Sequence, residues 1–211
     1  AQYFRDQYDS SIATYPYINT AVQITRVEVW VTNRNAQTNN VRNLVALQDL
    51  GETSADQTRL DDLSPNFFTA ASVSGYPDNK ANQLSPEQLG SGILTNDIRD
   101  IATTRNGFGT LSGTVQEGID YAVLESARKL ETTDYTLHPK LGYISLRQRL
   151  NNDEILAVAF QYTVGGQTFQ VGEFAGDGVP SSSTSGSGQT QQVLNNSLVV
   201  KLLRSNLTNV E

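Results

Sequence analysis

His138 is the only histidine of the chain and therefore its first candidate for proton transfer near neutral pH. It is followed by Pro139, and the segment His138 to Gly142 is expected to form a turn. A general base needs an orienting partner and a pocket, and nothing beside His138 supplies either. We interpret it as a solvent-exposed turn residue. With one histidine and no cysteine, a metal site built on imidazole or thiolate ligands is excluded.

Acidic side chains are the next candidates, because carboxylates can bind calcium. Asp56, Asp61 and Asp62 lie close together, and Asp177 stands between two glycines. Neither group has the alternating acids and central glycine of an EF-hand loop. We therefore interpret these residues as solvated loop acids and predict no metal.

Catalytic motifs are missing. The sequence lacks the Gly-x-Ser-x-Gly elbow and a phosphate-binding loop ending in Lys-Ser or Lys-Thr. Glycoside hydrolysis needs two carboxylates facing a cleft, and the 22 acidic residues single out no pair. We predict a protein without catalytic residues and without a cofactor.

Aromatic residues are candidates for binding a partner. Trp30 lies on the strand face opposite Val27, Val29 and Val31. It belongs either to the core of a sheet covered on both sides or to a surface that anchors a partner, because tryptophan is enriched in both places. Tyr143 is a second candidate contact.

The overall composition excludes several classes of protein. A net charge of −7 with scattered basic residues argues against nucleic-acid binding. No apolar stretch approaches the roughly 20 residues of a membrane helix. The chain contains no methionine, even at position 1, and we expect an interior or processed segment of a longer protein.

The first elements are a helix and a strand. Aromatic and aliphatic residues at helical spacing predict a helix over residues 3–12. Residues 20–32 predict a strand, with a bulge near Thr25 because the earlier and later β-branched residues are out of phase. After a polar turn, residues 41–50 are expected to return as the second strand of a hairpin.

The middle of the chain, residues 53–118, is predicted to be an irregular, partly helical insertion. Ser85 is expected to cap a short helix that has Pro86 at its first position. Residues 96–104 predict a second helix, and the glycine-rich residues 106–118 predict a loop.

The last third predicts β-structure. Residues 121–131 suit either helix or strand. Later expectations are strands on both sides of the His138 turn, a hairpin joined by Gly165-Gly166, a disordered low-complexity loop at 176–190, and a closing strand at 193–203. The fold class is therefore α+β, mainly antiparallel β with a few short helices, and we predict one domain over residues 1–211.

Four ordered stretches resemble the SprA family, which includes the Sov proteins. The longest, residues 24–52, reads ITRVEVWVTNRNAQTNNVRNLVALQDLGE. The others are residues 127–146, 152–174 and 199–203. Residues 53–118 resemble the family only loosely.

The resemblance implies an origin in a very large outer-membrane β-barrel, the translocon of the type IX secretion system, which exports folded proteins and serves gliding motility. Implied partners are secreted cargo proteins, other type IX secretion subunits and the barrel of the same chain. This segment would be a soluble domain inserted between barrel strands, exposed at the cell surface, with a periplasmic position as the alternative. The family supplies no catalytic residues.

Two functions remain open. One is an interaction domain of a protein-conducting channel, which could bind by strand addition at residues 41–50 or through Trp30 and Tyr143. The alternative is a carbohydrate-binding or hydrolytic cell-envelope domain, which requires a cleft lined by aromatic residues and paired acids.

Overall fold

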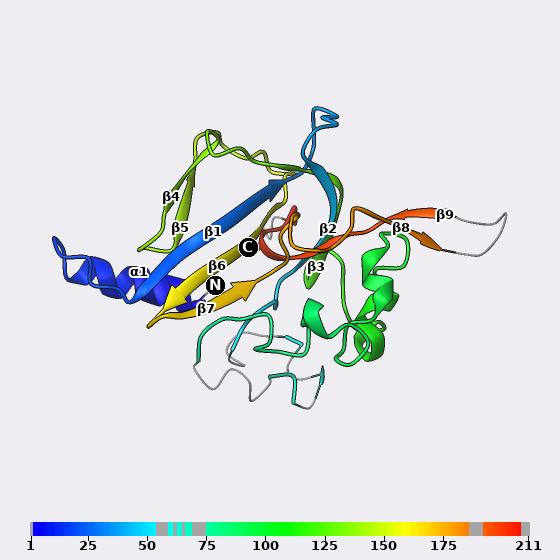
Figure 1. Cartoon of the computed structure of the whole chain (residues 1–211), viewed down its shortest axis with the longest axis horizontal. Coiled ribbons are helices and arrows are strands. Elements are labelled where there is room, and N and C mark those ends of the chain that lie inside the picture. The colour runs from blue at the N-terminus through cyan, green and yellow to red at the C-terminus, as the bar shows by residue number, and fades with distance from the viewer. Residues whose placement is uncertain are drawn as a thin grey trace.

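The computed structural model of the chain describes residues 2–53, 59–60, 63–64, 66–68, 75–185 and 192–207. Figure 1 shows a small β-barrel with an N-terminal helix on one side, irregular segments on another, and two separate hairpins. Three of the acidic residues singled out above, Asp56, Asp61 and Asp62, lie outside the described residues. The fourth, Asp177, is not simply solvated but forms an ion pair with Arg26.

The barrel is a closed ring of five strands. They are hydrogen-bonded in the order β1 (Val22–Val31), β3 (Tyr121–Lys129), β2 (Val41–Leu47), β10 (Leu198–Arg204) and β6 (Leu156–Val164), and β6 pairs with β1 to close the ring. All neighbours are antiparallel except β2 and β10. The fold is thus mostly β with a few short helices, as predicted, but its barrel is mixed.

Two local predictions for these strands are confirmed. The register between β1 and β6 shifts between Ile24 and Arg26, which is the bulge expected near Thr25. β6 and β7 (Gln167–Val171) form the hairpin expected at Gly165-Gly166, and both glycines have positive φ. The ambiguous segment after residue 120 is strand β3.

The prediction of a hairpin between β1 and residues 41–50 is wrong. β2 lies between β3 and β10 and does not pair with β1. Residues 44–47 of β2 are buried on both faces, which is typical of a central strand. Both edges of β2 are occupied, so the proposed strand addition at this segment is also wrong.

The barrel interior is filled by Trp30 and Phe174 together with leucine and alanine side chains. Each of the five strands contributes to a single buried cluster that includes Trp30 and five alanines. A barrel of five strands has a narrow interior that side chains must fill. Alternating residues face outwards, as the valines of β1 do.

The outer wall is covered by three separate layers. Helix α1 (Gln2–Ala13), which confirms the helix predicted over residues 3–12, packs on Val22, Ile24 and Tyr162. The hairpin of β4 (Tyr135–His138) and β5 (Tyr143–Leu146) covers a neighbouring apolar part of β1 and β6. The irregular middle of the chain covers the third part.

Three 3-10 helices occur in the described middle segment. Ser85 caps η3 (Pro86–Gln88), as predicted, by accepting a hydrogen bond from the Glu87 amide. η4 (Asn96–Arg99) is shorter than the predicted helix over 96–104. η5 (Asn106–Leu111) occupies a segment predicted as loop, because burial of Phe108 and Leu111 in the core beside Tyr121 holds these residues in a helical turn.

The C-terminal region differs from its prediction in two ways. β8 (Ser182–Ser185) and β9 (Gln192–Asn195) form a hairpin where a disordered loop was expected, although residues 186–190 of that loop lie outside the described residues. The single closing strand predicted over 193–203 is two strands. The break follows from Asn196, whose amide bonds the Ser181 carbonyl, and Ser197, whose amide bonds the Arg99 carbonyl.

Candidate functional site

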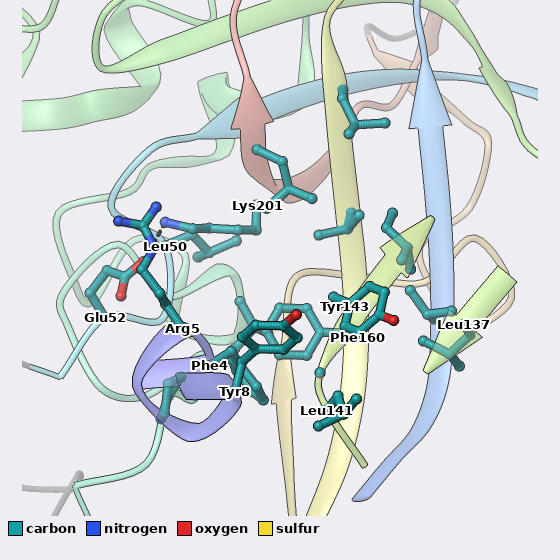
Figure 2. Close-up of a pocket in the computed structure, with 18 residues that line it drawn as sticks. Phe4, Arg5, Tyr8, Leu50, Glu52, Leu137, Leu141, Tyr143, Phe160 and Lys201 are labelled. Atoms are coloured by element: carbon teal, nitrogen blue, oxygen red, sulfur yellow. Dashed lines mark hydrogen bonds and ion pairs between the residues drawn. The ribbon is translucent and has the colours of Figure 1, made fainter. Parts of the chain in front are cut away.

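An apolar groove of about 600 Å³ runs over the outer wall of the barrel between α1 and the β4–β5 hairpin. Val27, Val158 and Phe160 form its floor. Figure 2 shows Phe4 and Tyr8 entering from the helix and Tyr143 from the hairpin. Its apolar lining and its position between two separate elements make it the candidate site.

The helical spacing of Phe4 and Tyr8 explains how α1 builds one wall. Residues four apart lie on the same helix face. Phe4 meets the rings of Phe160 and Tyr162 edge-on at centroid distances of 5.3 and 5.1 Å. Gly142 permits this approach, because its φ is +68° and a Cβ there would lie 2.8 Å from the Phe4 ring.

The opposite wall carries the ring of Tyr143, which is 37% exposed. It stacks on His138 at 4.3 Å and meets Tyr8 edge-on at 5.6 Å, so it links the hairpin to α1 at the rim of the groove. His138 is the last residue of β4 and is half-buried rather than an exposed turn residue. Its ring contact with Tyr143 accounts for the difference.

One end of the groove is charged. The buried Lys201 ammonium forms an ion pair with Glu52 and donates a hydrogen bond to the Gln48 carbonyl. Burial opposes ionisation of Glu52, but the charge and hydrogen bond of Lys201 are among the effects that hold the pKa of Glu52 below its ordinary value. Figure 2 shows Arg5 at the same end.

Comparison with protein families matches residues 1–151 to SprA_N, described as a motility-related secretion protein. The chain belongs to this family. Membership confirms the resemblance noted in the sequence and assigns the chain to motility and secretion. No match was found among curated proteins.

The SprA_N match includes α1 and the β4–β5 hairpin, which are the two walls of the groove, but ends before β6. Part of the groove floor and the charged Lys201 therefore come from beyond the matched residues. None of the helices described is both long enough and apolar enough to cross a membrane.

Of the two aromatic contacts predicted from the sequence, only Tyr143 lies at this site. Trp30 is 1% exposed and fills the barrel interior. The structure thus decides between the two interpretations in favour of the core, because the residues of β1 on the Trp30 face point into a closed barrel.

Sequence reasoning missed an exposed apolar tip where α1 leads into β1. The tip comprises Ile12, Tyr15, Tyr17 and Ile18, and its tyrosines are 79% and 80% exposed. The run Tyr-Pro-Tyr-Ile was a usable signal, since it is apolar and lies outside the helical and strand patterns. Arg5 and Lys201 were also missed, because only the folded chain brings them to one groove end.

The arrangement at this site does not resemble a hydrolytic centre. Among the residues lining the groove, Glu52 is the only carboxylate, and it is engaged by Lys201. No cluster of three or more metal-ligating side chains occurs within the residues that the structure covers. The groove can bind an apolar molecule, and the adjoining tip can contact an apolar surface.

Proposed function

We propose that this SprA_N family member is a non-catalytic interaction domain of the type IX secretion translocon, supporting protein export and gliding motility. Family membership supports the general role in secretion and motility. The observation that carries the docking role is the apolar tip of Ile12, Tyr15, Tyr17 and Ile18. Exposed apolar clusters commonly mark interaction sites.

The tip is suited to a protein partner. Tyrosine buries a large ring while its hydroxyl can still hydrogen-bond, which makes it frequent in interfaces. Tyr143 of β5 contacts Tyr8 of α1, the helix that ends at the tip, and we include it in the proposed contact surface. Partners would be secreted cargo proteins, other secretion subunits or the outer-membrane barrel of the same chain, and no nucleic acid is expected at a net charge of −7.

The proposed location is the outer membrane, with the domain on the cell-surface side of the barrel. Long insertions in such barrels usually form extracellular loops. A periplasmic position is the alternative. The competing function, a carbohydrate-binding or hydrolytic envelope domain, gains no support from a groove whose single carboxylate is held in an ion pair.

The test replaces Tyr15 and Tyr17 by serine in the full-length secretion protein and measures its assembly and cargo export together. Val193→Ser is the matched control, because Val193 is also an exposed apolar residue but lies in β9. We expect normal assembly with reduced export in the tip variant and normal export in the control. Unchanged export in the tip variant would contradict the proposal.

Deletion of the whole segment, bridged by a flexible linker, separates transport from assembly. If the membrane protein assembles but export fails, the domain acts in transport. A protein that no longer assembles would instead assign the domain a role in biogenesis.

A further inference from the structure

We propose that the groove between α1 and the β4–β5 hairpin binds a long-chain carboxylic acid. The acyl chain lies along the barrel wall and the carboxylate meets Arg5. This inference does not depend on the tip or on its proposed partner.

The volume of the groove suits a small molecule. At about 600 Å³, it falls within the range of pockets that bind single small molecules.

The backbone of the floor strands argues against an extended peptide. β1 is paired with β6 along its length, and β6 is paired with β10 and β7 on its other edge. The floor therefore presents side chains rather than free amides and carbonyls. A peptide lying on it would leave its own backbone groups without partners, which is costly. A hydrocarbon chain has no such groups.

The lining is apolar along most of its length. Residues from the floor and both walls include Phe4, Val27, Leu137, Ile144, Val158 and Phe160. Each methylene of an acyl chain that is moved from water onto this surface strengthens binding by roughly three- to fourfold.

The charged end selects the head group. The side chains lining it are Arg5, Glu52 and Lys201, and Lys201 and Glu52 neutralise each other in their ion pair. Arg5 has neither a hydrogen bond nor an ion pair with any residue that the structure describes. The described side chains at this end therefore carry a net positive charge, and a guanidinium binds a carboxylate through two parallel hydrogen bonds.

The test is calorimetric titration of the 211-residue chain with saturated carboxylic acids of increasing length, below their micelle concentrations, and with the alcohols of equal length. We expect affinity to rise with each methylene until the groove is full and then to level off. The acid should bind roughly fivefold more tightly than the alcohol. Absence of binding, equal affinity for acid and alcohol, or no dependence on chain length would overturn the proposal.

Variants locate the site. Arg5→Gln should abolish the preference for acid while leaving alcohol binding unchanged, and Val27→Trp should fill the groove and abolish both. Leu203→Glu, at an exposed residue of the lining, should weaken acid more than alcohol and serves if Val27→Trp does not fold. Tyr17→Ser, at the separate tip, is the control and should bind normally. Normal binding in both Val27→Trp and Leu203→Glu would place the ligand elsewhere and overturn the proposal.

A short apolar peptide with a free C-terminal carboxylate completes the set of probes. If a leucine pentapeptide displaces bound dodecanoic acid only at a concentration much higher than that of the acid, the result supports an acyl chain as the occupant of the groove. Displacement by the peptide at lower concentration would assign the groove to a polypeptide and overturn the proposal.

Discussion

Arg99 and Glu173 form a bidentate ion pair that connects the irregular middle of the chain to the barrel. The guanidinium nitrogens lie 2.5 and 2.6 Å from the two carboxylate oxygens, and both side chains are largely buried. Glu173 also accepts a hydrogen bond from the Val199 amide in β10, while Arg99 donates one to the Ser197 carbonyl. The pair thus anchors η4 at the start of the closing strand.

Arg99→Ala should lower the free energy of unfolding by about 3 kcal/mol, because it leaves Glu173 as a buried charge without its partner. The double variant with Glu173→Gln should lose less than the sum of the two single variants, since the unpaired charge is gone. Urea unfolding gives the free energy of unfolding of all three variants. Simple additivity would show that the pair is not energetically coupled.

Stability should fall at alkaline pH, and Tyr162 should contribute to the fall. Burial of its hydroxyl, with smaller effects from Tyr3 and Asp78, raises the pKa of Tyr162 in the folded chain. Above about pH 10 the unfolded chain loses this proton first. The folded state then binds more protons than the unfolded state, so the free energy of unfolding decreases as pH rises.

Tyr162→Phe tests this effect. Its loss of the hydrogen bond from the hydroxyl to the Pro77 carbonyl, 2.6 Å long, should cost about 1–2 kcal/mol near neutral pH. Above pH 10 its stability should decline less steeply than that of the unchanged chain. Parallel slopes in urea unfolding across this pH range would contradict the assignment.

Trp30 and Tyr143 should respond very differently to truncation. Trp30→Ala leaves a cavity in the barrel interior and should lower the free energy of unfolding by about 3–5 kcal/mol. Tyr143→Ala removes only ring contacts at the groove rim and should cost about 1 kcal/mol. Chemical unfolding compares the two. Equal losses would be inconsistent with one side chain lying in the core and the other at the surface.

The chain should not fold when cut at the end of the family match. A chain of residues 1–151 lacks β6 and β10, which pair with β1 and β2 in the closed barrel. We expect it to show no cooperative thermal transition, whereas a control chain ending at Leu207 keeps every barrel strand and should unfold cooperatively. A sharp transition in the shorter chain would show that the first 151 residues fold by themselves.

Gly107 and Gly113 provide a matched pair in the middle segment. A Cβ at Gly107 would lie 2.5 Å from the Ile98 Cα, while a Cβ at Gly113 would meet nothing within 4 Å. Gly107→Ala should therefore cost about 1–3 kcal/mol. Gly113→Ala should be neutral or slightly stabilising, because it restricts the unfolded chain. Thermal unfolding distinguishes the two, and equal stability of both variants would argue against the close packing of η5 on η4.

Local features of the fold were predictable from the sequence. The spacing of Phe4 and Tyr8 indicated a helix, the phase change near Thr25 indicated a bulge, and Gly165-Gly166 indicated a hairpin. Each depends on contacts and backbone preferences within a few residues, which the sequence carries directly. The resemblance to the SprA family was likewise visible in ordered stretches of sequence, and the family comparison confirms it.

Only the tertiary structure decided what these elements do together. β2 pairs with β10 rather than β1, Trp30 turns into the core, and Arg5 and Lys201 meet at one end of a groove. The physical reason is the closure of the barrel between β1 and β6, two strands far apart in the chain. Alternation along a strand identifies its two faces, but only closure determines which face becomes the interior and which becomes the wall of a binding site.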